Sequence, residues 1–99
     1  MAYIDPVQSS PNNYKSLLDE GGVRVLKMTV PPGTSDIEHS HPTETVYFVK
    51  GGKVRIHVEG GDPMELDIPD GHTMNHGPWT HRVENIGETE IQAIIFERK

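Results

Sequence analysis

Residues 53–58, Lys-Val-Arg-Ile-His-Val, alternate strictly between polar and apolar side chains. A period of two is typical of a β-strand that has one face in a core. It places Val54, Ile56 and Val58 on one face and His57 on the other. His57 is therefore expected to be a solvated strand residue.

Short stretches rich in Val and Ile lie on both sides of this strand, and each is closed by Gly, Pro or Asp. Gly51 and Gly52 suit a tight hairpin, because glycine accepts positive φ. Turn signals at spacings of about 8–12 residues are typical of sandwiches and barrels. Several short strands in one small chain hide their edges when two sheets close face to face, so the sequence predicts an all-β barrel whose middle can hold a ligand. The predicted strands cover residues 23–30, 44–50, 53–58, 64–68, 72–76, 80–86 and 89–97.

The first 22 residues have a different composition. Residues 1–13 contain Pro6, Pro11 and several Ser and Asn residues, which resist regular structure. Residues 14–20 can form one helical turn that Gly21 and Gly22 would end. We therefore expect a short irregular N-terminal arm over residues 1–22 and a barrel domain over residues 23–99.

The overall composition excludes several classes of protein. The chain has 99 residues, which suits one domain, and no Cys, so disulfides and thiolate metal clusters are excluded. Nine Lys and Arg against 15 Asp and Glu give a net charge of -6, which argues against nucleic acid as a partner. With no apolar run of about 20 residues and no signal sequence, we expect a cytoplasmic protein with no membrane partner. A chain this short has a small core, so a homodimer is expected.

Two of the six histidines, His39 and His41, lie two residues apart. In an extended segment this spacing points both imidazoles to the same side, where they can converge on one ion. Glu44 is the nearest downstream carboxylate, and His81 on a later strand can supply a third imidazole. Such a set suits a divalent metal ion (Fe, Mn, Ni or Zn). Two histidines on a surface loop would have the same spacing, so this pattern alone leaves both interpretations open.

The residues around this pair form a longer motif. Gly33 is followed by five residues, His39-Ser-His41, two residues, Glu44, six residues and Gly51. This arrangement resembles the first motif of the cupin superfamily, from which it departs by one missing residue between His41 and Glu44.

A second segment resembles the second cupin motif. His81 and Asn85 match the end of this motif, and Gly71 lies one residue closer to His81 than the first glycine of the motif lies to its histidine. In this alignment His76 and Pro78 replace the proline and glycine of the family. An alternative alignment uses residues 69–71 as the Pro-x-Gly element, but it needs a long insertion before His81.

The resemblance extends over residues 23–96. It implies a double-stranded β-helix, or jelly-roll, barrel with a divalent metal ion held by His39, His41, Glu44 and His81. The odd step from His41 to Glu44 would turn Glu44 away in a straight strand, so its participation requires a bend at Pro42.

Three further residues are candidates for the surroundings of the metal. His72 and His76 share the parity of Met74 on one strand. If that face looks inward, His76 lies near the metal and can move a proton; otherwise both histidines decorate the outer sheet, the interpretation favoured for His72. Trp79 can form the wall of the pocket mouth.

These observations predict a small metal-dependent enzyme. An ion with three or four protein ligands keeps open positions for a substrate, so dioxygenation or a related oxidation or isomerisation of a small polar molecule is the expected reaction, with His76 as the catalytic residue. The alternative is a non-catalytic barrel that binds a small metabolite or a metal, since a fold does not determine a reaction.

Overall fold

The computed structural model describes residues 3–99, and almost all of its regular structure within that range is β. The single short helix is α1 (Pro6–Ser9). The strands are β1 (Tyr14–Glu20), β2 (Val23–Val30), β3 (His39–His41), β4 (Glu44–Lys50), β5 (Gly52–Val58), β6 (Met64–Ile68), β7 (Thr73–His76), β8 (Trp79–Asn85) and β9 (Ile91–Arg98).

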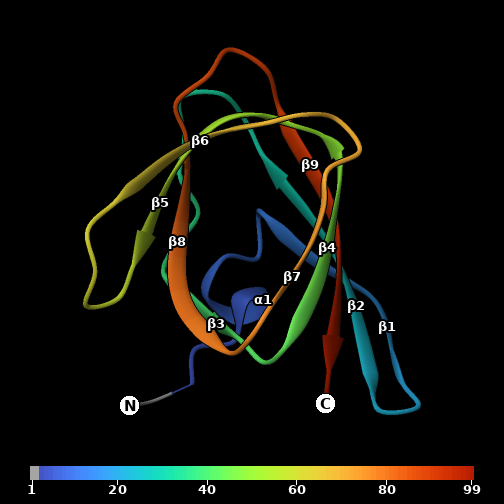
Figure 1. Cartoon of the computed structure of the whole chain (residues 1–99). Helices are drawn as coiled ribbons and strands as arrows, with labels where there is room; N and C mark the ends of the chain where they lie inside the picture. The colour runs from blue at the N-terminus through green and yellow to red at the C-terminus, as the bar shows by residue number, and fades with distance from the viewer. Residues whose placement is uncertain (1–2) are drawn as a thin grey trace.

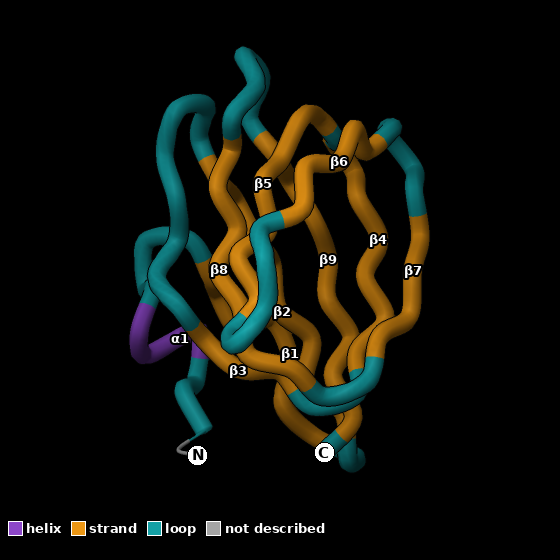
Figure 2. The backbone as a smooth tube through the Cα atoms, turned by 60° about the vertical axis from the view of Figure 1, so that its left-hand side comes forward, coloured by secondary structure: helices purple, strands orange, loops and turns teal. Residues whose placement is uncertain are grey.

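The strands form two antiparallel sheets that face each other as a barrel (Figure 1, Figure 2). One sheet has the order β1-β2-β9-β4-β7, and the other has the order β3-β8-β5-β6. Apart from the consecutive pairs β1–β2 and β5–β6, successive strands lie in different sheets, as expected for a jelly-roll fold. The predicted all-β barrel is therefore confirmed. Among the described residues, no helix is long and apolar enough to cross a membrane.

The interpretation of residues 14–20 as a helical turn is wrong, because they form the edge strand β1. Gly21 and Gly22 have φ values of 65° and 76°, so they form the tight turn that returns the chain into β2. Only Tyr14 of this strand is buried, so the segment lacks the alternation that identifies a strand in the sequence. Strand pairing therefore crosses the expected boundary between residues 22 and 23.

Gly51 does not close a hairpin as expected, because β4 and β5 belong to different sheets. The chain crosses between the sheets at this residue. A Cβ atom on Gly51 would lie 1.9 Å from the carbonyl oxygen of Ile68, so only glycine allows this close approach of two backbones.

Strand alternation separates the core from the outer surface. On β4, Val46 and Phe48 point into the barrel, whereas Tyr47 points outward and is 44% exposed. Phe96 on β9 is also an outward residue, so parity rather than hydrophobicity decides which side chains enter the core. The buried apolar residues are Tyr14, Leu26, Met28, Val30, Val46, Phe48, Val54, Ile56, Ile68, Val83, Ile91, Ala93 and Ile95.

Candidate metal centre and cavity

Three buried imidazoles meet at the end of the barrel formed by β3 and β8. In this antiparallel pair, His39 lies directly opposite His81, and His41 lies opposite Trp79. The spacing of two residues puts His39 and His41 on the inner face, as predicted. One ligand atom from each of the three histidines lies within 4.8 Å of the others, so the group could hold a metal ion.

His81 has the environment expected of a metal ligand. Its side chain is buried, yet neither ring nitrogen has a hydrogen-bond partner within residues 3–99. Burial, followed by the neighbouring His39 and His41, lowers the pKa of His81 to about 2, so the imidazole is neutral at neutral pH. A neutral ring with a free lone pair is the form that binds a metal, so these residues fit the ion that the sequence implies.

The other two imidazoles are held in one tautomer. His39 Nδ1 donates to the carbonyl oxygen of Ile37 at 2.7 Å, and His41 Nδ1 donates to the carboxylate of Glu97. Each ring therefore keeps its Nε2 lone pair for a ligand. Burial, followed by the proximity of His41, lowers the pKa of His39 to about 4.

A buried polar pair lies beside the Nε2 atom of His39, with the Tyr14 hydroxyl donating its proton to Asp36. The Tyr14 hydroxyl lies 2.8 Å from Asp36 Oδ2 and 3.1 Å from His39 Nε2. The backbone N–H of Val83 donates to the other carboxyl oxygen of Asp36. Burial raises the pKa of Asp36 to about 6 and raises the pKa of Tyr14 well above its usual value, so the phenol stays protonated at neutral pH.

A chain of charged groups supports His41. Glu97 accepts from His41 on one side and from Arg24 Nε at 2.8 Å on the other, and Arg24 also pairs with Asp5 at 3.0 Å. Burial alone would raise the pKa of Glu97, but the hydrogen bonds from His41 and Arg24 outweigh burial and lower it. Asp5 caps α1 through its hydrogen bond to Val7, so the N-terminal segment contributes to the support of the site.

These supporting residues were not predicted from the sequence. Glu97 has the same inward parity on β9 as Ile91, Ala93 and Ile95. This position of a Glu on the buried face of an apolar strand could have indicated its supporting role. Tyr14 gave no such signal, because it lies in the segment that was expected to be irregular.

Glu44 lies beside the three histidines but is not one of the group. The bend at Pro42 and Thr43 separates β3 from β4 and places Glu44 on the inner face, buried. Its Oε2 atom accepts a hydrogen bond from the indole N–H of Trp79, and its Oε1 atom is 3.8 Å from His41 Nδ1. Burial raises the pKa of Glu44. Its role as a fourth ligand stays a prediction.

His76 lies on the inner face of β7, next to the group. Its ring stacks on Trp79 with 3.6 Å between ring centroids, and Trp79 in turn lies 4.0 Å from the ring of His81. His76 Nδ1 donates to the carbonyl oxygen of Gly77, which leaves Nε2 as the nitrogen that can take up a proton. The indole thus connects the candidate proton carrier to the imidazole group.

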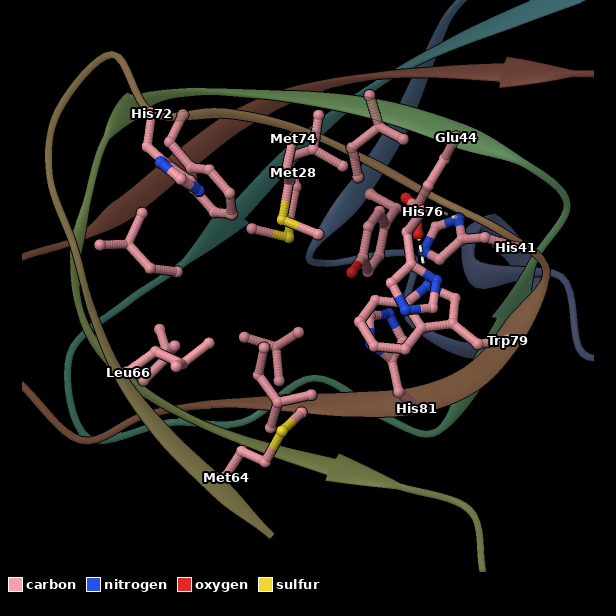
Figure 3. A pocket seen from close by; sticks show the side chains of 18 residues that line it. Met28, His41, Glu44, Met64, Leu66, His72, Met74, His76, Trp79 and His81 are labelled. Atoms are coloured by element: carbon pink, nitrogen blue, oxygen red, sulfur yellow. Dashed lines mark hydrogen bonds and ion pairs between the residues drawn. The ribbon is translucent and has the colours of Figure 1, made fainter. Parts of the chain in front are cut away.

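A cavity of about 190 Å³ extends from the imidazoles into the barrel (Figure 3). The polar side chains gather at one end, whereas His72 lies at the other (Figure 3). His72 is exposed, but it lines this cavity instead of decorating the outer sheet as expected. The lining consists of Tyr14, Met28, His41, Glu44, Val46, Phe48, Val54, Ile56, Met64, Leu66, Ile68, His72, Met74, His76, Trp79, His81, Val83 and Ile95.

Solved structures with a similar architecture include cupin domains. A cupin domain from Bordetella pertussis Tohama I has a TM-score of 0.77 at 20% identity, over 100% of this chain and 98% of the other. A DMSP lyase, DddQ, from Ruegeria pomeroyi has a TM-score of 0.62 at 21% identity, over 100% and 54%. An oxalate oxidase in complex with the substrate analogue glycolate has a TM-score of 0.61 at 22% identity, over 79% and 42%. At these identities the likeness concerns the fold alone.

The sequence comparisons give one family. No curated protein sequence matches the chain. The Cupin domain family (Cupin_2) matches residues 26–96, which include all three histidines of the group and most of the strands of both sheets. This chain therefore belongs to the cupin family.

Proposed function

We propose that this cupin is a metal-dependent enzyme that carries out a dioxygenation or a related oxidation or isomerisation of a small molecule. The proposal rests on three buried imidazoles that meet at the end of a cavity large enough for a ligand. One of them, His81, has no hydrogen bond to any of residues 3–99. Burying two unsatisfied ring nitrogens costs stability, and a metal ion would remove much of that cost.

His39, His41 and His81 would hold the ion, which we propose to be Fe, Mn, Ni or Zn, with Glu44 as a fourth ligand. Such an ion supplies Lewis acidity and, in the case of iron or manganese, redox chemistry. Because Glu97 and the Ile37 carbonyl hold the other two rings from behind, the ligand set is oriented before the ion arrives.

The other polar groups of the cavity have roles that follow from their positions. His76 would take up or deliver a proton at Nε2, since Nδ1 is engaged with Gly77. Trp79 holds His76 in place by stacking and covers the imidazole of His81. The apolar walls exclude water from the rest of the cavity, which strengthens electrostatic interactions at its polar end.

Metal content measured on untagged protein tests this proposal. Wild type is expected to bind about one equivalent of metal, whereas His39→Ala and His81→Ala lose it. His57→Ala is a matched control, because His57 lies on the outer face of β5, where it pairs with Glu84. Equal trace metal in all four proteins would contradict the site.

Oxygen uptake after loading with Fe(II) separates an enzyme from a binder. Catechols, thiols and small keto acids form the first substrate panel. Turnover that disappears in His76→Gln while metal content stays unchanged would support the role of His76. Metal loading without turnover of any compound would favour the alternative, a non-catalytic cupin that binds a metabolite or metal.

We also propose that the chain forms a homodimer through the outer face of the five-stranded sheet. Leu18, Tyr47 and Phe96 are 43%, 44% and 45% exposed on that face. Leu18 is paired in register with Val25, and Val25 with Phe96, so their side chains form one apolar row across three strands. Apolar side chains gathered on one face are typical of an interface between proteins.

A further inference from the structure

The walls of the cavity differ from those expected for a polar substrate. Apart from the histidines and Glu44 at its polar end, and His72 at the other end, the side chains that line the cavity are apolar or aromatic. No Lys or Arg lines the cavity in the part of the chain that the structure describes. A second charged group on a ligand would therefore lose its hydration without gaining an ionic partner.

The two ends of the cavity are chemically different (Figure 3). His41, His76 and His81 form one end, whereas Met28, Met74 and Leu66 belong to the body of the cavity. Methionine side chains adapt to irregular apolar shapes and make favourable contacts with aromatic rings. The arrangement suits a molecule with one polar end, directed at the imidazoles, and an uncharged apolar body.

The opening of the cavity is also apolar. Met64 and Leu66 on β6 line the cavity and are 45% and 44% exposed, so they lie where the cavity meets solvent. β6 and β7 are the last strands of their respective sheets, and no strand pairing joins them within residues 3–99. A ligand therefore enters across apolar side chains.

The volume limits the size of the ligand. An apolar cavity of roughly 150 Å³ accommodates benzene in another protein. The present cavity measures about 190 Å³, which leaves room for a ring with one or two small substituents or for a short branched chain. Nucleotides are too large, and sugars would lose the hydration of their hydroxyl groups against the apolar walls.

Building on the proposed function, we infer that the substrate is a small amphipathic molecule with a single metal-binding head and a neutral apolar body, such as an alkyl-substituted ring. Compounds with a second charged group are poor ligands. The cavity thus selects against the small dianions that a metal centre alone would attract.

Two probes with the same chelating head test this inference. At the same ring position, 4-methylcatechol carries a methyl group and 3,4-dihydroxybenzoate carries a carboxylate. Binding is measured by calorimetry on zinc-loaded protein, because zinc does not oxidise catechols. Burial of the methyl group alone should raise affinity about fourfold. Because the carboxylate of the other probe would be buried without a partner, the affinity for 4-methylcatechol should be roughly 100-fold higher than that for 3,4-dihydroxybenzoate. Equal affinity, the opposite preference, or no binding of either probe overturns the inference.

A pair of variants locates the binding. Leu66→Asp places a carboxylate at the opening, whereas Leu17→Asp makes the same change at a similarly exposed position on β1, outside both the cavity and the apolar row of the proposed interface. The first variant is expected to lower the affinity for 4-methylcatechol at least tenfold, and the second is expected to change that affinity by less than a factor of two. An equal effect in both variants contradicts binding in this cavity.

Zinc content, measured on the same samples, keeps the two proposals separate. If the protein takes up no zinc, the metal site and the proposed function fail, and titration of the two catechols into the metal-free protein still decides the substrate class. If zinc binds and the carboxylate is tolerated, the proposed function stands and the inference about the substrate falls.

Discussion

Replacing His81 with leucine should make the metal-free protein more stable while it abolishes metal binding. This expectation follows from the environment of the ring, which is buried and has both nitrogens without a partner within residues 3–99. A residue that serves only the fold would have the opposite effect, because its removal would cost stability. The variant therefore separates a ligand from a structural histidine.

The magnitude follows from two opposing contributions. Each unsatisfied buried nitrogen costs about 1–3 kcal/mol, and leucine has a similar volume but no polar atom. The ring of His81 packs against those of Trp79, His39 and His41, and loss of such contacts costs about 0.5–1.5 kcal/mol. The two nitrogens together cost about 2–6 kcal/mol, so after the lost ring contacts the free energy of unfolding should rise by about 1–5 kcal/mol. For a domain of this size each kcal/mol shifts Tm by about 4–8 °C.

Thermal unfolding in chelator and in excess zinc measures both effects. In chelator, His81→Leu should melt above wild type. In zinc at about 100 times Kd, wild type should gain about 2.7 kcal/mol and the variant nothing. His57→Leu, on the outer face of the neighbouring β5, should differ little from wild type and keep the zinc response. A less stable His81→Leu in chelator, or an unchanged response to zinc, would show that His81 serves the fold and is not a metal ligand.

Three other predictions concern the surroundings of the site. Glu97→Gln should weaken zinc binding about 10- to 100-fold without removing a ligand, because Glu97 orients the ring of His41; an unchanged Kd from competition with a chromogenic chelator would contradict this role. The metal-free chain should lose about 2 kcal/mol of stability from about pH 7.5 to about pH 5.5, because unfolded His39 and His81 take up protons near pH 6.5 while burial keeps their folded pKa values at about 4 and about 2. Asp36 offsets part of that loss, because burial raises its pKa to about 6 and the folded protein therefore takes up a proton there on acidification. Urea unfolding measures this stability, and a stability that rises on acidification would contradict the prediction. Sedimentation at micromolar concentration should show a dimer that Phe96→Asp converts to a monomer, and a monomeric wild type would reject the proposed interface.

Most of the strands could be predicted because alternation and turn residues are local signals. The predicted bounds of β2, β4 and β6 coincide with those in the structure, and the other predicted strands differ by one or two residues at their ends. β1 was missed since six of its seven residues are exposed, so its sequence carries no alternation. Its stability as a strand comes from pairing with β2, which a local pattern does not reveal.

The site was predictable only where neighbouring residues shared a strand. His39 and His41 were placed on one face by their spacing, and the register of β3 with β8 brings His81 opposite His39. The supporting groups come from distant parts of the chain: Glu97 lies 56 residues from His41, and Tyr14 lies 25 residues from His39. Contacts of this kind depend on how the sheets close, which composition and periodicity do not specify.

Similarly, the chemistry of the cavity depended on the closed structure. The sequence suggested a polar substrate because the histidines were its most distinctive residues. The structure adds the walls, where Met28, Met74 and Leu66 come from three different strands. Their convergence changes the expected ligand from a polar molecule to one with an apolar body.

Anomalous diffraction at the zinc edge, from crystals grown with one equivalent of zinc, would show whether the three imidazoles share one ion. We expect a single strong peak among His39, His41 and His81, about 2.0–2.1 Å from one nitrogen of each ring. No peak at this position, or a peak bound by only one of the three imidazoles, would contradict this expectation.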